Sequence, residues 1–308
     1  MYTTKTQLIE LHPNVKINTI STHPTTTPPE TDPLPTLVFL HFWGGSTRTW
    51  SHVLPAISPT YPTLAIDFRG WGTSTGPDDA VAYNISDLAA DVQAVISALE
   101  LHSVVLVGLS MGAKVAQVVA AQLSSISIKH GGNGSGDGNG NGNADGEGKK
   151  TGSALRGLIL ISPAPTTPLI LPPEMREQQL HAYESRESAT FVAQNVLTSS
   201  FRKHSQREEV PEFLVADMLR GNRWARGAWP AYAMAEDVSP AVEGKIKVPV
   251  LVIAAEEDVV EPLERVRKEV CERIEGVRLE VLEGSGHLSV VDVPEAVVEK
   301  VVEFVKGL

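Results

Sequence analysis

The stretch Val104–Ala121, VVLVGLSMGAKVAQVVAA, decides the fold of this chain. An apolar, β-branched run leads into the pentapeptide GLSMG at 108–112, and small residues at helical spacing follow it. This order predicts a buried strand, a sharp turn and a helix, with Ser110 at the apex of the turn. The two glycines let the backbones approach closely, and the helix N-terminus would place free N–H groups beside the serine hydroxyl. The alternative interpretation is an ordinary glycine-bearing turn, so residues elsewhere in the chain must decide between the two.

The bulk composition fits one large α/β domain or two small ones. The 308 residues are 42% hydrophobic and 20% charged, and the net charge is −11. Because no basic stripe is present, we expect neither nucleic acid nor a membrane surface as a partner. A single cysteine, Cys271, excludes an internal disulfide and a cysteine-based metal site. The first residues lack the basic start and apolar core of a secretory signal, and no apolar run is long enough to span a membrane, so we expect a cytoplasmic protein.

Buried strands alternate with helical stripes along most of the chain. This alternation predicts an α/β fold, with a mostly parallel sheet flanked by helices on both faces. The opening segments 6–11 and 15–22 alternate apolar and polar residues, as half-exposed antiparallel strands do. The expected buried strands, besides the one before Ser110, are 36–41, 63–67, 154–162, 248–254 and 277–282.

Two regions depart from the alternation. Residues 163–240 carry only helical stripes, so we expect a helical cap inserted between a first core part, 1–162, and a second core part, 241–308. Residues 131–150 contain glycine, asparagine and charged residues but no large apolar side chain. Such a segment cannot bury enough surface to offset its ordering entropy, so we expect a disordered insertion on a surface loop.

Candidate partners for Ser110 follow two later strands. Catalytic groups of a parallel sheet gather beyond the carboxyl ends of its strands. Asp258 comes shortly after the strand that ends at residue 254, and His287 follows the strand that ends at residue 282. We interpret His287 as the general base and Asp258 as the acid that orients it, in the chain order serine, acid, histidine. Two neighbouring carboxylates stay open as alternatives for the acid: Glu256 and Glu257.

The loop HFWGGS, which begins at His41, follows the strand where a second oxyanion donor is expected. The backbone N–H of Trp43 is our candidate, paired with that of Met111. For His41 we favour a structural role, in which its ring hydrogen-bonds the loop. We likewise expect Asp67 and Arg69 to organise the glycine-rich loop FRGWGTS rather than to take part in chemistry.

Together these pieces resemble the α/β-hydrolase superfamily, in the capped branch that includes esterases, cofactor-free haloperoxidases and perhydrolases, C–C bond hydrolases and epoxide hydrolases. The matching stretches, in the family's order, are LHFWGGSTRTW, AIDFRGWGTS, VGLSMGA, LVIAAEEDVVEP and GSGHLSVVDVPE. The resemblance implies the α/β-hydrolase fold and a triad of Ser110, Asp258 and His287. Epoxide hydrolases of this superfamily attack with aspartate, whereas this chain carries Ser110 as the nucleophile. The resemblance therefore implies acyl transfer, without a metal or organic cofactor.

One residue departs from the family's pattern. The oxyanion loop usually begins His-Gly, whereas here Phe42 follows the histidine. Phenylalanine cannot adopt unusual backbone angles as glycine can, and its side chain would narrow the acyl pocket. We also expect the cap to line that pocket, although aromatics at helical spacing commonly pack between cap and core instead. The candidate lining residues, besides Phe42, are Phe191, Trp224, Trp229, Tyr232 and Met234.

The sequence therefore predicts a serine hydrolase that cleaves a small, fairly apolar carboxylic ester or lactone through an acyl-enzyme. Two alternatives keep the same triad: a perhydrolase or haloperoxidase-like activity, with peroxide in place of water, and C–C bond hydrolysis. A third alternative is a receptor-like protein that binds a ligand and has slow or vestigial catalysis. The sequence does not indicate an oligomeric state.

Overall fold

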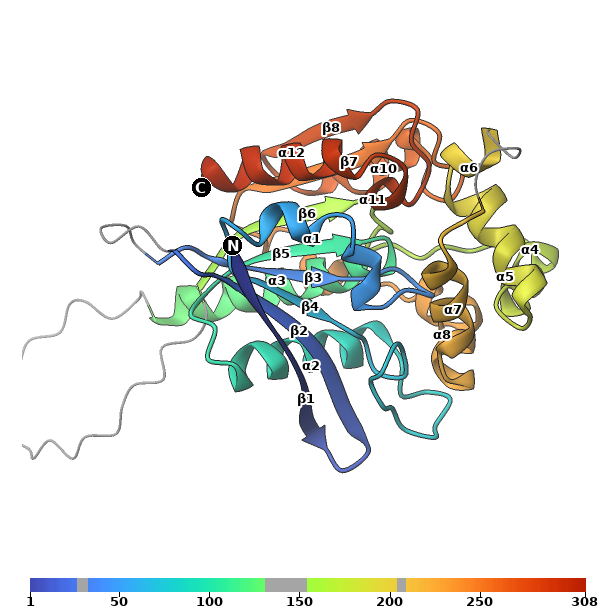
Figure 1. Ribbon diagram of the computed structural model, residues 1–308, viewed down its shortest axis with the longest axis horizontal. Helices are drawn as coiled ribbons and strands as arrows, with labels where there is room; N and C mark the ends of the chain where they lie inside the picture. The colour runs from blue at the N-terminus through green and yellow to red at the C-terminus, as the bar shows by residue number, and fades with distance from the viewer. Residues whose placement is uncertain (27–32, 131–153, 204–208) are drawn as a thin grey trace, which may run out of the picture.

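A computed structural model describes residues 1–26, 33–130, 154–203 and 209–308. In this part of the chain, eight strands form one sheet in the order β1-β2-β4-β3-β5-β6-β7-β8 (Figure 1). The expected insertion at 131–150 lies outside the described residues. The strands are β1 (Tyr2–His12), β2 (Val15–Pro24), β3 (Thr36–Leu40), β4 (Thr63–Ile66), β5 (Ser103–Leu109), β6 (Ala154–Ile161), β7 (Val250–Ala255) and β8 (Val277–Leu282).

The sheet is mostly parallel, as expected. Only β1 and β2 run antiparallel, to each other and, for β2, to β4. The register places Leu40, the last residue of β3, opposite Ile66 of β4 and Gly108 of β5. The loops that follow β3, β4 and β5 therefore leave the sheet at the same edge. The α/β fold with a mostly parallel sheet that the alternation of strands and helices predicted is confirmed.

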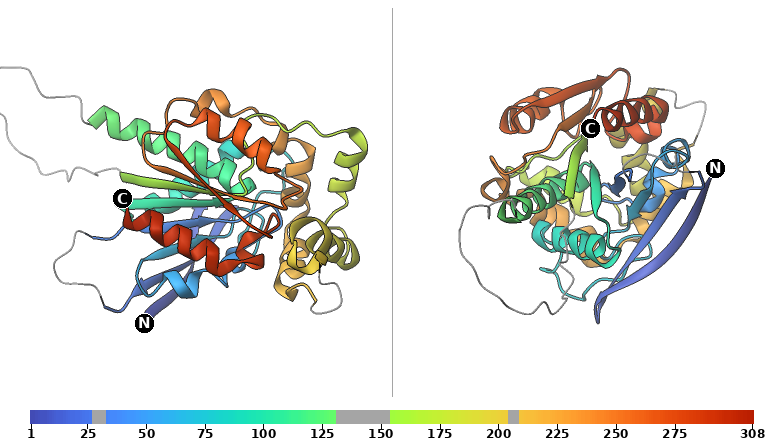
Figure 2. Two further views of the ribbon diagram at one scale, coloured as in Figure 1. Left: turned by 90° about the horizontal axis from the view of Figure 1, so that it is seen from above. Right: turned by 90° about the vertical axis from the view of Figure 1, so that its left-hand side faces the viewer.

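Helices cover both faces of the sheet. The long helices α2 (Ile85–Ala98) and α3 (Met111–His130) pack on one face, and α1 (Leu54–Ile57) and α12 (Pro294–Lys306) pack on the other (Figure 2). This double cover explains why the central strands are apolar throughout: Val104–Leu109 is fully buried. Within the described ranges, no helix combines the length and apolarity that a membrane crossing requires.

Between β6 and β7 the described chain forms helices and no strand, and we call its residues 166–203 and 209–238 the helical segment. It lies beyond the carboxyl ends of the parallel strands (Figure 1). Its two ends meet: the Leu169 amide donates to the Met234 carbonyl, and the Val238 amide donates to the Thr166 carbonyl, both at 2.9 Å. The helices are α4 (Pro173–Leu180), α5 (Arg186–Val192), the π-helical turn η2 (Ala193–Leu197), α6 (Ser200–Lys203), α7 (Glu212–Arg220) and α8 (Arg223–Ala231).

Candidate active site

Ser110 occupies the turn between β5 and α3, with a backbone φ of +56°. This left-handed conformation is uncommon for a residue other than glycine and stores strain. Both flanking glycines are required by close backbone contact. A Cβ on Gly108 would lie 2.5 Å from the Gly112 carbonyl oxygen, and a Cβ on Gly112 would lie 2.3 Å from the Leu40 carbonyl oxygen. The Ser110 amide donates to the Ile161 carbonyl at 3.0 Å, which fixes the turn against β6.

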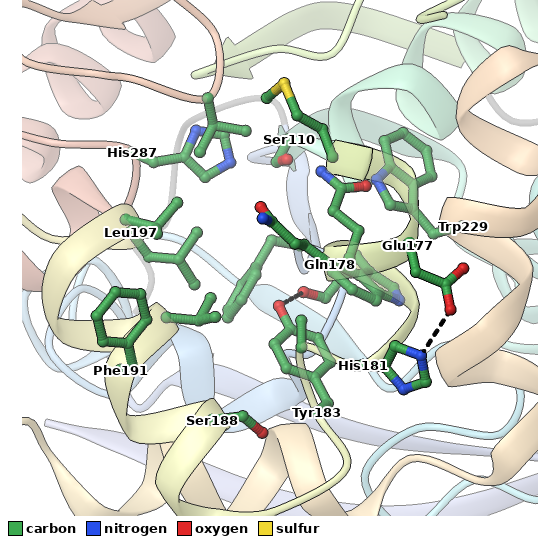
Figure 3. Close-up of a pocket in the computed structure, with 18 of the residues that line it drawn as sticks. Ser110, Glu177, Gln178, His181, Tyr183, Ser188, Phe191, Leu197, Trp229 and His287 are labelled. Carbon is green, nitrogen blue, oxygen red and sulfur yellow. Dashed lines mark hydrogen bonds and ion pairs between the residues drawn. The ribbon is translucent and has the colours of Figure 1, made fainter. Parts of the chain in front are cut away.

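His287 and Asp258 meet beyond the ends of β8 and β7. The imidazole Nδ1 donates to Asp258 Oδ2 at 2.8 Å, and both residues are buried. The other carboxylate oxygen accepts the backbone N–H groups of Val260 at 2.8 Å and Glu261 at 2.9 Å. With Nδ1 protonated and held, Nε2 is the nitrogen left to exchange a proton. His287 and Ser110 face each other at the inner end of one pocket (Figure 3).

The environment of His287 changes its basicity. Burial would lower the pKa of this imidazole, but the charge and hydrogen bond of Asp258, with a smaller contribution from Glu261, raise the pKa above its ordinary value. Of the alternative acids, Glu256 accepts the Gly284 amide at 2.9 Å and lies on the surface. The structure thus brings Asp258, and not Glu256, to the imidazole.

The His287 loop also contacts the helical segment. The Leu288 amide donates to the Leu197 carbonyl at 2.8 Å. Asp292 Oδ2 accepts the amides of Gly286 and Ser199, each at 2.9 Å, and so joins the loop to the start of α6. The position of the histidine therefore depends on contacts from both the core and the helical segment.

The loop after β3 is a tight turn. The Gly45 amide donates to the Phe42 carbonyl at 3.0 Å, and Gly44 has a φ of +98°, as position i+2 of a type II turn requires. The backbone strain expected from phenylalanine at position 42 does not arise, because the positive φ of this loop falls on Gly44 and not on Phe42. The Phe42 side chain is buried and lines the pocket.

His41 holds this loop, as its structural interpretation predicted. Nε2 accepts the Phe68 amide at 3.0 Å, so Nδ1 carries the proton and donates to the Phe42 carbonyl at 2.7 Å. Burial lowers the pKa of His41, despite the nearby carboxylate of Asp67. The neutral imidazole therefore links the loop after β3 to the loop after β4 by hydrogen bonds.

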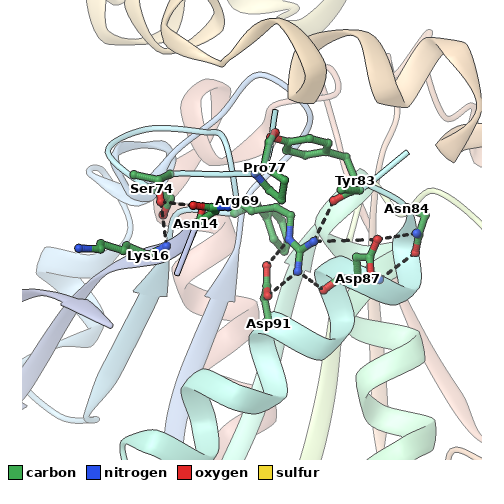
Figure 4. Close-up of polar contacts among 12 residues, drawn as sticks. Asn14, Lys16, Arg69, Ser74, Pro77, Tyr83, Asn84, Asp87 and Asp91 are labelled. Carbon is green, nitrogen blue, oxygen red and sulfur yellow. Dashed lines mark hydrogen bonds and ion pairs between the residues drawn. The ribbon is translucent and has the colours of Figure 1, made fainter. Parts of the chain in front are cut away.

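The glycine-rich loop after β4 is organised by buried charges, also as expected (Figure 4). Asp67 accepts the Thr73 amide at 2.9 Å. Arg69 binds both oxygens of Asp91 on α2, at 2.6 and 2.7 Å, and donates to the Ala82 carbonyl at 2.8 Å. None of these groups lines the pocket.

The candidate oxyanion donors are the amides of Trp43 and Met111. Neither amide donates to an acceptor within the described part of the chain. Met111 is the first residue of α3, where a helix leaves its N–H groups without an intrahelical partner. Trp43 lines the pocket, whereas the Met111 side chain is buried away from it.

The pocket above Ser110 has a volume of about 950 Å³ and lies between the core and the helical segment (Figure 3). Three of the predicted lining aromatics are there: Phe42, Phe191 and Trp229. The other three predicted residues do not line this pocket. The Trp224 indole N–H donates to Asp78 on the surface, and the Tyr232 hydroxyl bridges the Tyr83 amide and the Ala80 carbonyl. Met234 is buried at the end of the helical segment, away from this lining.

Sequence reasoning missed the wall contributed by α4, α5 and η2. The apolar part of this wall includes Met175, Tyr183, Val192, Val196 and Leu197. The rim carries the carboxylates of Glu177 and Glu187, and no lysine or arginine is among the described lining residues. His181 at the rim is paired with Glu177 at 2.9 Å and with Glu184 at 2.8 Å. Helical periodicity showed that these helices exist, but it gave no signal for which of their faces meets the core.

Comparison with known proteins agrees with this fold. A curated epoxide hydrolase from Caballeronia sordidicola is 35% identical over 101 residues, 32% of this chain, and the match spans only 30% of that protein's length. A putative non-heme bromoperoxidase, BpoC, from Mycobacterium tuberculosis is 26% identical and aligns over 87% of this chain and 92% of its own. The solved structure of an esterase from Exiguobacterium antarcticum has a TM-score of 0.72 at 22% identity, covering 98% of this chain and 100% of its own.

The family assignment rests on a broader match. The sequence profile of the Alpha/beta hydrolase family matches residues 37–300, which include Ser110, Asp258 and His287 and the loops that hold them. The chain belongs to the Alpha/beta hydrolase family.

Proposed function

We propose that this protein is a serine hydrolase that cleaves a carboxylic ester or lactone through an acyl-enzyme. One observation carries the proposal: Ser110, on its strained turn, shares the inner end of a pocket with His287, whose Nδ1 is held by Asp258. This is the arrangement of nucleophile, base and orienting acid that acyl transfer requires. We further propose that the helical segment acts as the cap of the site.

The proposed reaction has two halves. His287 Nε2 takes the Ser110 proton as Oγ attacks the ester carbonyl, and it then protonates the leaving alkoxide, which departs as the alcohol. In the second half, His287 takes a proton from water as the water attacks the acyl-enzyme, and it returns that proton to Ser110 Oγ as the acid leaves. Asp258 stabilises the imidazolium in both halves. The amides of Trp43 and Met111 would receive the oxyanion, each lowering the barrier by about 3 kcal/mol.

The pocket supports a substrate with an apolar body. Its inner wall is aromatic and aliphatic, and its volume of about 950 Å³ exceeds what a short acyl group fills. At the rim, Glu177 and Glu187 lie beside one basic side chain, His181, which is itself paired with Glu177 and Glu184. We therefore expect a neutral or cationic molecule rather than an anionic one. A small-molecule ester that is larger than an acetate ester is the substrate class that fits best.

A second candidate function uses the same residues. The bromoperoxidase relative aligns over 92% of its own length, and peroxide in place of water would turn the acyl-enzyme into a peracid. C–C bond hydrolysis on the same triad is a further variant. The epoxide hydrolase relatives do not lead us to propose epoxide opening for this chain, because a serine nucleophile does not form the alkyl ester through which those enzymes open an epoxide.

A fluorophosphonate probe tests the proposal directly. We expect the folded protein to be labelled at Ser110, and we expect Ser110→Ala to lose both labelling and hydrolysis of p-nitrophenyl esters. A series of esters of increasing acyl length then reports the pocket size, and added hydrogen peroxide reports peracid formation. Unchanged hydrolysis by Ser110→Ala would sink the proposal, and a folded wild type that binds esters without labelling would favour the receptor-like alternative.

A further inference from the structure

We infer that Tyr183 is a positioning residue that fixes the oxyanion loop from the helical segment. The inference rests on the proposed function, because it assigns the Trp43 amide to the oxyanion. Tyr183 lies between α4 and α5, far in sequence from the loop that it contacts. Three observations carry the inference: a cycle of hydrogen bonds, a tilted pair of aromatic rings in contact, and the space beside Gly44 that the Tyr183 ring fills.

The cycle joins three segments of the chain. The Tyr183 hydroxyl donates to the Trp43 carbonyl at 2.9 Å. The Trp43 indole N–H donates to the Arg226 carbonyl at 3.0 Å, and Arg226 Nη1 donates to the Tyr183 carbonyl at 2.7 Å. Each side chain thus donates to the main chain of the next residue, so none of the three can move without breaking two hydrogen bonds. We call this the Trp43–Tyr183–Arg226 cycle.

Packing restrains the same residues. The rings of Tyr183 and Trp43 lie 4.2 Å apart between centroids, with 30° between their planes. A Cβ on Gly44 would lie 2.6 Å from the Tyr183 ring, so the ring occupies the space that a side chain on the turn would need. Burial raises the pKa of the Tyr183 phenol, which keeps the hydroxyl a neutral donor across the working pH range.

The position of the hydroxyl explains its effect. Within the described residues it is the only donor to the Trp43 carbonyl, which lies in the peptide that links Trp43 to Gly44. Fixing this peptide fixes the turn, and with it the direction of the adjacent Trp43 amide. An oxyanion donor is effective when it is already aimed before the reaction begins. The helical segment would therefore set the rate of the chemical step as well as the shape of the pocket.

The test compares Tyr183→Phe with a matched control, Tyr232→Phe. The control removes a hydroxyl from the same helical segment, one that bonds the Tyr83 amide and the Ala80 carbonyl outside the pocket. For Tyr183→Phe we expect kcat to fall about tenfold, less than the loss of a whole oxyanion donor, while KM stays within twofold. We expect a trifluoromethyl ketone, whose serine adduct carries an oxyanion, to bind about tenfold more weakly. Hydrogen–deuterium exchange at residues 42–45 should quicken in Tyr183→Phe alone.

Arg226→Gln provides a second break in the cycle, should Tyr183→Phe be too unstable to measure. It should raise exchange at residues 42–45 and lower kcat by a smaller factor. The inference is overturned if Tyr183→Phe changes only the melting temperature or KM, or if its loop exchanges like that of Tyr232→Phe. Failure of the proposed function is separate: wild-type protein would then not be labelled at Ser110, while the exchange measurement would still decide whether Tyr183 holds the loop.

Discussion

At the scale of single residues, the proposed role of His287 as base predicts that its charge state sets the pH range of activity. The base must be neutral at Nε2, and Asp258 raises the pKa of the imidazole above its ordinary value of 6.5. We therefore expect kcat/KM to rise with pH through a midpoint above 6.5 and to be low below it. A pH–rate profile on a neutral ester checks this. Asp258→Asn should lower kcat by about 10⁴-fold, as loss of the orienting acid does in other triads, and should shift the midpoint downward. A wild-type midpoint at or below 6.5 would contradict the assignment.

Gly112 provides a second test at this scale. In Gly112→Ala the new Cβ would meet the Leu40 carbonyl, a backbone atom that cannot turn away, so the start of α3 must shift from β3. We expect a loss of about 2–3 kcal/mol in the free energy of unfolding and a large loss of activity. Gly227→Ala is the control, because no atom lies within 4 Å of its Cβ and it sits inside α8. Urea denaturation of the control should give a free energy of unfolding that is unchanged or higher by up to about 1 kcal/mol.

Residue-scale predictions from the sequence succeeded where the signal was local. The alternation of strands and helices predicted the sheet, and the place of His41 at the end of a strand predicted that its ring would hydrogen-bond the loop that follows. The lining aromatics failed for a different reason. Trp224 and Phe191 both lie on helical stripes, but only Phe191 lines the pocket, whereas Trp224 packs partly against the core and donates to Asp78. Which of the two reaches the pocket depends on how α5 and α8 dock, and periodicity does not show this. Tyr183 had no sequence signal, because its partner is a main-chain carbonyl.

At the scale of elements, Lys114 fastens α3 to both ends of the helical segment. Its buried ammonium group donates to the carbonyls of Thr167 at 3.4 Å, Met234 at 3.3 Å and Glu236 at 2.7 Å. Burial lowers the pKa of Lys114 to about 8, because it disfavours the charged ammonium group. The hydrogen bonds to the three carbonyls offset part of this desolvation cost. Lys114→Met leaves them without this donor.

We expect Lys114→Met to lower the free energy of unfolding by about 1–3 kcal/mol, because buried carbonyls lose their partner. Limited proteolysis should also cut the helical segment faster. Lys245→Met is the matched control, since that lysine bonds the carbonyls of Pro240 and Ala241 while exposed to solvent. The control should change stability by less than about 0.5 kcal/mol. Equal effects of the two substitutions would show that Lys114 is not a special junction.

At the scale of the whole molecule, the charge distribution predicts selectivity. The chain carries a net charge of −11, and the described pocket rim adds Glu177 and Glu187 beside one basic side chain, His181, which is paired with Glu177 and Glu184. An ester with a distal carboxylate should therefore have a kcat/KM several-fold lower than a neutral ester of the same length. The difference should shrink in high salt, because the rim is exposed and screened. Glu177→Gln with Glu187→Gln should reduce the discrimination, and equal rates for both esters would contradict this reading of the rim.

The meeting of the two ends of the helical segment has a consequence for how this protein could diversify. Because Leu169 bonds Met234 and Thr166 bonds Val238, the connection from β6 to β7 is closed before the helices begin. Exchanging the helices beyond these two hydrogen bonds would leave the sheet unchanged, so new pockets could arise by grafting a different helical segment. Each graft would still have to supply a donor for the Trp43 carbonyl and the contacts that the segment makes with the His287 loop, and these requirements would restrict which segments are interchangeable.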